Sequence, residues 1–110
     1  MIAIFEELHD IFGIEGYFIY DLPKRITILN KMPLTIDEKA MKQLITTFMN
    51  RQQSAMDMAR SFEIFYGIEK RIYFSRFENY IFIALGTNNC DLMMLHQKLS
   101  EVWLRFTLKL

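Results

Sequence analysis

The side chains that could perform chemistry in this 110-residue chain are few and far apart. His9 and His96 are its only histidines, and Cys90 is its only cysteine. Proton transfer or nucleophilic catalysis needs such groups within hydrogen-bond reach of one another, and a metal site needs ligands at short, regular spacing. No such spacing occurs in the sequence, so it predicts neither a catalytic centre nor a bound metal.

Each of these residues has a structural interpretation that we favour. Cys90 stands at the expected start of a helix, where a thiolate could be stabilised. A reactive cysteine also needs a base, and the sequence places none beside it, so Cys90 is predicted to be a small buried residue. Both histidines lie off the apolar stripes of their expected helices, so we expect them at the solvated surface.

Nucleotide binding and acyl-transfer chemistry also lack their usual motifs. Gly13 and Gly16 follow a predicted helix, whereas a phosphate-binding loop lies between a strand and a helix. No serine has the flanking glycines of a nucleophile elbow. We therefore expect a protein with no cofactor and no enzymatic activity of its own.

The composition excludes several further classes of protein. The chain has 13 Lys and Arg against 13 Asp and Glu, and 52% of its residues are hydrophobic, which argues against disorder. It lacks the cationic excess that binding to nucleic acid requires. The aromatic residues between Phe62 and Phe82 are accompanied by acids as well as bases. They are therefore interpreted as core and not as a base-stacking surface.

Length and hydropathy indicate one soluble domain, residues 1–110. This length supports a single core, and no apolar run approaches the roughly 18 residues of a membrane-spanning helix. The N-terminal segment carries acids and no basic leader, unlike a secretory signal. A single thiol suits a reducing compartment, so we expect a cytoplasmic protein without membrane insertion.

Hydrophobic periodicity divides the chain into eight expected elements. Apolar residues three and four apart predict helices over 2–12, 35–62 and 91–109. Aromatic and β-branched residues predict strands over 17–21, 25–30, 63–69, 71–77 and 80–85. Thr35 and Glu38 have the spacing of a capping box, and Asn79 is expected to take positive φ in the last hairpin turn.

This order predicts an α+β fold. Strands joined by hairpins form an antiparallel sheet, here of five strands, with the long central helix on one face and the two terminal helices on the other. The run 80–85 is apolar on both sides, which places it at the sheet centre. The run 63–69 is expected at an edge, with few charges to prevent pairing with another chain.

The stretch Ile11-Phe12-Gly13-Ile14-Glu15-Gly16-Tyr17-Phe18-Ile19-Tyr20-Asp21 leads from the first expected helix into the first expected strand. It is similar to the same passage in the roadblock/dynein light chain family, which the sequence resembles. The resemblance continues in Asn79-Tyr80-Ile81-Phe82-Ile83-Ala84-Leu85-Gly86 and in the helix start Asn89-Cys90-Asp91-Leu92, so it covers nearly the whole chain. Gly16-Tyr17-Phe18-Ile19 departs from the Gly-Ile-Pro-Ile type of the dynein-associated branch and looks more like the prokaryotic branch. Longin and profilin-like layouts share parts of the arrangement.

The resemblance implies a homodimer whose long central helices and adjoining edge strands pair into one continuous sheet. It also implies a non-enzymatic module that binds and regulates or scaffolds a small Ras-like GTPase. The residues favour self-association independently, because the apolar stripe of 35–62 is wider than one sheet face needs. The expected interface residues are Phe48, Arg51, Gln52, Ala55, Met58, Ile64, Tyr66 and Ile68.

Two alternatives stay open at the level of sequence. The chain could be a small-ligand-binding or sensor domain of profilin-like type, with a pocket lined by its flexible methionines, or a purely structural dimer scaffold. The polar interruption 50–54 raises a related question about Arg51. Its guanidinium is interpreted either as a polar contact at the dimer centre or as a contact to a partner's acidic surface or phosphate.

Overall fold

Five strands form one antiparallel sheet in the order β2-β1-β5-β4-β3. The computed structural model describes residues 2–52, 60–67 and 69–108. In chain order, the elements are η1 (Ile2–Asp10), β1 (Ile14–Asp21), β2 (Ile26–Asn30), α1 (Glu38–Gln52), β3 (Arg60–Tyr66), β4 (Lys70–Phe77), β5 (Tyr80–Thr87) and α2 (Leu92–Leu108). The expected α+β class is confirmed.

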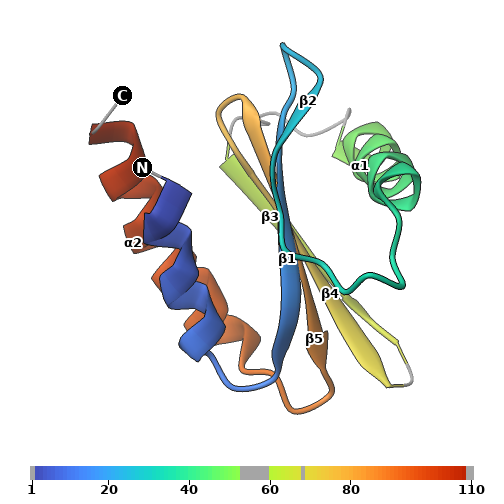
Figure 1. Ribbon diagram of the computed structural model, residues 1–110, viewed down its shortest axis with the longest axis vertical. Coiled ribbons are helices and arrows are strands. Elements are labelled where there is room, and N and C mark those ends of the chain that lie inside the picture. The colour runs from blue at the N-terminus through green and yellow to red at the C-terminus, as the bar shows by residue number, and fades with distance from the viewer. Residues whose placement is uncertain (1, 53–59, 68, 109–110) are drawn as a thin grey trace.

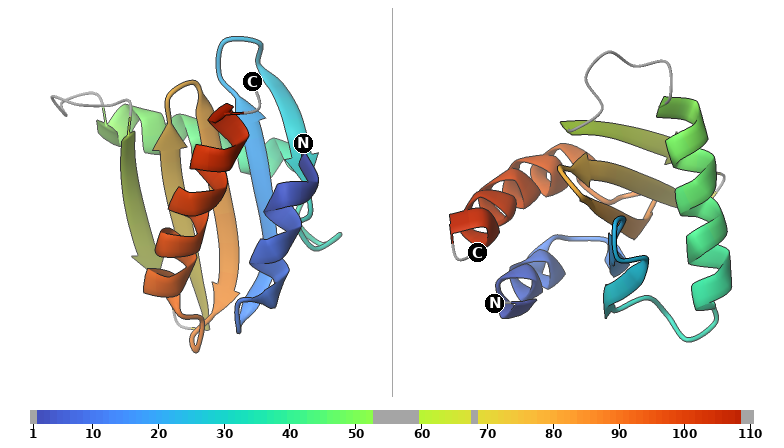
Figure 2. Two further views of the ribbon diagram at one scale, coloured as in Figure 1. Left: turned by 90° about the vertical axis from the view of Figure 1, so that its left-hand side faces the viewer. Right: turned by 90° about the horizontal axis from the view of Figure 1, so that it is seen from above.

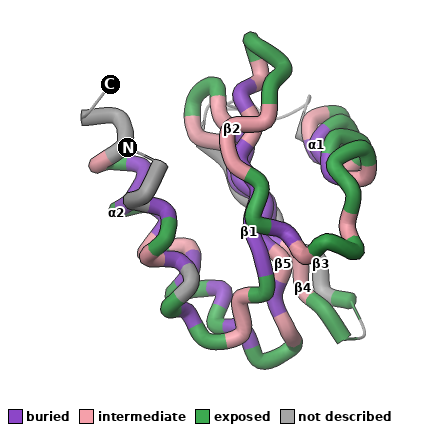
Figure 3. Tube along the Cα trace, in the orientation of Figure 1, coloured by how far each residue is buried: buried purple, intermediate pink, exposed green. Residues whose placement is uncertain are grey.

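Helices cover both faces of the sheet (Figure 1). Helix α1 lies on one face, and η1 and α2 lie side by side on the other, as both views of Figure 2 show. Strand β5 occupies the centre of the sheet, as expected from its apolar character. Its residues 81–84 are buried (Figure 3) because each face of the strand meets a helical layer. No described helix has both the length and the hydropathy needed to cross a bilayer.

Each face of the sheet has its own hydrophobic cluster. On the η1–α2 face, Trp103 packs edge-on against Phe5, with ring centroids 5.1 Å apart, and stacks on Phe77 at 5.2 Å. On the α1 face, Phe48 stacks on Phe74 of β4 at 5.2 Å. The two clusters hold the helical layers to the sheet.

The first helix differs from its prediction in type. Residues 2–10 form a 3-10 helix and not an α-helix. A 3-10 helix has three residues per turn, so the three-residue spacing of Phe5, Leu8 and Ile11 aligns these side chains toward the sheet, where all three are buried. Phe12, expected on the same apolar face, is instead 74% exposed.

The predicted central helix was too long at both ends. It begins at Glu38, because Asp37 and not Thr35 caps it: the Ala40 amide donates to Asp37 Oδ1 at 2.7 Å. The Glu38 carboxylate accepts from the Thr27 hydroxyl and does not close a capping box. Phe62, expected in this helix, lies in β3, where aromatic and β-branched residues pair with β4.

Turns and caps also depart from their predictions in detail. In the last hairpin turn Glu78, and not Asn79, has positive φ, at 54°. Gly13 has φ 88°, as expected for a glycine that ends a helix. Helix α2 starts at Leu92 because the Met94 amide donates to Asp91 Oδ1 at 3.0 Å.

Candidate functional site

Strand β3 is an edge of the sheet, as the sequence predicts. It pairs with β4 along its whole length, from Arg60 opposite Phe77 to Tyr66 opposite Arg71. Within the described ranges, no strand pairs with its other side. That side therefore presents backbone donors and acceptors that a further strand could use.

An apolar groove opens on one face of the sheet, between α1 and strands β4 and β5. It consists of two adjoining hollows of about 200 and 190 Å³ that share Leu44 and Ile72. We call these hollows the apolar groove, and its described lining is Met32, Ile36, Ala40, Met41, Leu44, Thr47, Phe48, Ile72, Phe74, Ile83 and Leu85. Leu44 and Ile72 are only half-buried, so apolar surface stays accessible on α1 and on β4, the strand that pairs with β3.

The predicted interface residues lie in different surroundings, and some of them lie outside the described residues. Phe48 is 1% exposed within a single chain and lines the apolar groove, and its contact with a second copy stays a prediction. Ile64 packs against the cluster on the η1–α2 face. Ala55, Met58 and Ile68 lie outside the described residues, as do the side chains of Arg51, Gln52 and Tyr66.

Cys90 is buried, as predicted. Burial raises the pKa of its thiol, and the opposing charge of Arg71 has a smaller effect. A thiol in this state is a poor nucleophile near neutral pH. The small side chain fits against Gly86, where an added Cβ would lie 2.9 Å from Cys90 Sγ.

His96 is not the freely solvated residue that the sequence predicts. It is half-buried, and its Nδ1 lies 2.6 Å from the hydroxyl of the buried Tyr73. Burial raises the pKa of Tyr73 to about 12, so the hydroxyl stays protonated and has a hydrogen to donate in this contact. The contact joins β4 to α2 across 23 residues, a separation that helix periodicity does not reveal. The side chain of His9 lies outside the described residues.

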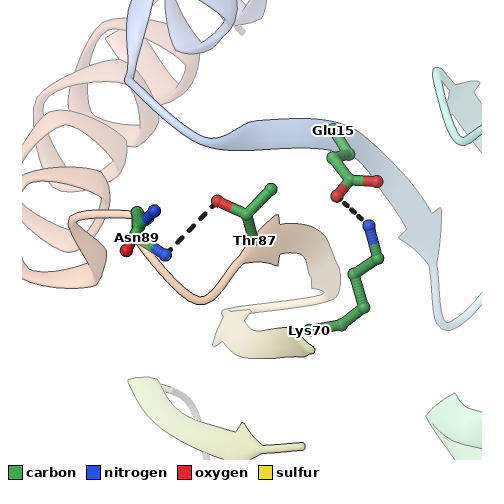
Figure 4. A network of polar contacts seen from close by, with 4 residues as sticks. All are labelled: Glu15, Lys70, Thr87 and Asn89. Carbon is green, nitrogen blue, oxygen red and sulfur yellow. Dashed lines mark hydrogen bonds and ion pairs between the residues drawn. The ribbon is translucent and has the colours of Figure 1, made fainter. Parts of the chain in front are cut away.

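Polar contacts close the end of the sheet where β5 leads into α2 (Figure 4). Lys70 of β4 and Glu15 of β1 form an ion pair across the end of β5. The backbone amide of Asn89 donates to Thr87 Oγ1 at 3.3 Å, and the backbone amide of Thr87 donates to the Gly13 carbonyl at 2.9 Å. These contacts hold the connection between β5 and α2 in place. In the described part of the chain, no three His, Cys, Asp or Glu residues are grouped to hold a metal ion.

A further hollow lies beside the β1–β2 hairpin, on the flank of α1 that faces away from the apolar groove. Its volume is about 430 Å³. Two cationic side chains, Arg25 and Lys42, contribute to its wall with Tyr20, Thr46 and Asn50. Leu22, Ile45 and Met49 form an apolar floor. We call it the cationic pocket, because none of its described lining residues is acidic.

Helical geometry places the apolar groove and the cationic pocket on different flanks of α1. Residues three and four apart share one flank of a helix, so Lys42, Thr46 and Asn50 line the cationic pocket. Leu44 and Thr47 lie on the opposite flank and line the apolar groove.

A comparison of the chain with models of protein families and with curated proteins found no match.

Proposed function

We propose that this chain is a cytoplasmic, non-enzymatic module of roadblock type that self-associates through β3 and binds a small Ras-like GTPase. The proposal combines the sequence resemblance with the arrangement of the elements. The helix and strand order, the edge position of β3 and the placement of α1 on one face alone are the features that the resemblance implies.

The observation that carries the proposal is the unpaired edge of β3, with the apolar groove over its neighbour strand β4 on the α1 face of the sheet. Pairing of two β3 strands would satisfy their outer backbone groups, and accessible apolar surface on α1 and β4 would be buried in the same step. Zero formal net charge means that two copies meet without long-range repulsion.

In this proposal the GTPase is the partner that performs chemistry. The sequence has no glycine-rich phosphate loop, so the nucleotide and the hydrolytic groups belong to the partner. The paired central helices of the dimer would offer a two-fold surface on which the partner's switch regions dock. The module then regulates or scaffolds the partner by contact alone.

Sedimentation equilibrium of a matched pair of variants tests the dimer. Thr46 and Thr47 are adjacent, exposed, and alike in donating to the carbonyl four residues earlier at 3.1 Å. Only Thr47 lines the apolar groove. At micromolar concentration we expect dimers for the wild type and for Thr46→Lys, and monomers of 13.2 kDa for Thr47→Lys. A monomeric wild type contradicts the dimer.

A binding assay tests the partner separately. The immobilised wild-type chain is offered small Ras-like GTPases loaded with GDP or with a non-hydrolysable GTP analogue. Retention in one nucleotide state and not the other supports the proposal, because switch regions differ between those states. A dimer that retains no GTPase in either state would instead be a structural scaffold.

A further inference from the structure

From the cationic pocket, we infer a binding site for a small organic phosphate, one that carries a phosphate dianion on an apolar, ring-sized body. The site does not depend on the proposed dimer, because it lies on the flank of α1 opposite the apolar groove. Its volume of about 430 Å³ falls in the range of small-molecule sites.

The charge of the pocket points to a dianion. Arg25 comes from the hairpin turn and Lys42 from α1, so two cations from separate elements line one hollow. Two carboxylates of the same hairpin and helix do not line the pocket and have partners of their own: Asp21 accepts from the Lys24 backbone amide at 3.1 Å, and Glu38 accepts from the Thr27 hydroxyl. A guanidinium fork and an ammonium group together suit the oxygens of a phosphate.

The hairpin holds Arg25 in an unusual backbone conformation. Arg25 has φ 56°, a left-handed value that is costly for a residue with a side chain. The surrounding turn enforces it, because the buried Asp21 accepts from the Lys24 amide, and the Leu22 amide donates to the Asn79 carbonyl at 2.9 Å. Glycine would be the unstrained residue here, so the presence of arginine is consistent with a use for its side chain.

The floor of the pocket explains why the ligand should carry an apolar body. Ile45 is buried, and Leu22 and Met49 are half-buried. Tyr20 stands beside them, with its ring stacked near Phe18 at 6.5 Å. An apolar ring placed on this floor would remove hydrocarbon surface from water, whereas inorganic phosphate would gain only the charge contacts.

Nuclear magnetic resonance titration of the full chain with four probes tests the site. Phenyl phosphate carries both features, inorganic phosphate only the charge, benzyl alcohol only the ring, and benzoate a ring with a single negative charge. We expect phenyl phosphate to shift the amide signals of Leu22, Ile45 and Thr46 and to bind about tenfold more tightly than each other probe. Equal affinity for phenyl phosphate and any one of the other three probes would overturn the assignment.

Three variants localise the binding. Arg25→Gly and Lys42→Gln each remove one cation and should weaken phenyl phosphate binding about tenfold. Lys24→Gln is the control, since Lys24 is an exposed cation of the same turn that does not line the pocket. Equal loss in all three variants would show non-specific charge attraction, and loss in none would show that neither Arg25 nor Lys42 contacts the ligand; either result would refute the site.

Folding of the variants is checked by thermal melting. Arg25→Gly should melt at the same temperature as the wild type or higher, because glycine accepts φ 56° without strain. Lost binding with unchanged or raised melting temperature then assigns the effect to the guanidinium. Should Arg25→Gly fold poorly, Lys42→Gln on the exposed surface of α1 decides the matter by the same tenfold criterion.

Discussion

The η1–α2 face and the α1 face of the sheet bury similar side chains but close over them differently. On the η1–α2 face, Trp103, Leu95 and Val102 are fully buried beneath two helical segments. On the α1 face, Phe48 and Ile45 are buried, whereas Leu44 and Ile72 beside them stay half-exposed. Hollows flank α1 on both sides.

The difference follows from the widths of the layers. Five strands about 4.8 Å apart span roughly 20 Å, and a helix with its side chains is about 10 Å across. Two helical segments can cover such a sheet, but one cannot. The α1 face is therefore where this chain has surface left for a ligand or a partner, while the opposite face supplies stability.

The largest expected effect comes from a matched pair of leucine truncations. Leu95→Ala in the closed layer should lower the free energy of unfolding by about 3 kcal/mol, because the surrounding core cannot collapse into the cavity. Leu44→Ala should cost only about 1 kcal/mol, since Leu44 already borders the apolar groove. Urea denaturation measures both values. Equal costs would mean that the two faces are equally closed in solution.

A glycine that joins η1 to the sheet offers the next test. An added Cβ at Gly13 would lie 2.8 Å from Cys90 Cα, and φ there is 88°. Gly13→Ala therefore combines backbone strain with a clash against main chain, and we expect a loss of about 2 kcal/mol in urea denaturation. Asp10→Ala, an exposed change nearby, serves as control and should stay within about 0.5 kcal/mol of the wild type.

Replacing the same two leucines by phenylalanine should change the free energy of unfolding in opposite directions on the two faces. In the Thr47→Lys background, where the proposed dimer is absent, Leu44→Phe can place its ring in the apolar groove and should raise the free energy of unfolding by about 0.5 kcal/mol. Leu95→Phe overfills a closed core and should lower it by about 2 kcal/mol. Calorimetry distinguishes the two, and destabilisation by both would show that the groove is already filled in solution.

The sequence predicted the strands better than the helices, for a physical reason. Alternation and aromatic content mark β1, β4 and β5 directly, and apolar character on both sides placed β5 at the centre. Helical spacing in 35–62 concealed the start of β3, because local periodicity does not register pairing with β4. The site was harder to foresee: Arg25 and Lys42 are 17 positions apart in the sequence, and only the docking of α1 beside the hairpin brings them to one pocket.

The smallest expected effect lies at the rim of the closed face, where an ion pair joins η1 to α2. Arg105 Nη1 donates to Glu7 Oε1 at 3.0 Å. The hydrogen bonds from Arg105 hold the pKa of Glu7 below its ordinary value of 4.5. A carboxyl whose folded pKa is depressed stabilises the fold above its unfolded pKa, and this contribution disappears as pH falls through the folded pKa. Glu7→Gln should therefore lower the melting temperature slightly at about pH 7 and leave it unchanged well below pH 4.5.

Glu6→Gln provides the control, because it removes an exposed carboxylate from the adjacent position. The difference between wild type and Glu7→Gln should also shrink in about 1 M salt, since both partners of the pair are more than two-fifths exposed and solvent ions screen them. If Glu6→Gln reproduced the same pH dependence, the effect would belong to the net charge of η1. A dependence confined to Glu7→Gln would instead show that the ion pair helps to hold η1 against α2, and with it the two-segment layer that distinguishes this face from the α1 face.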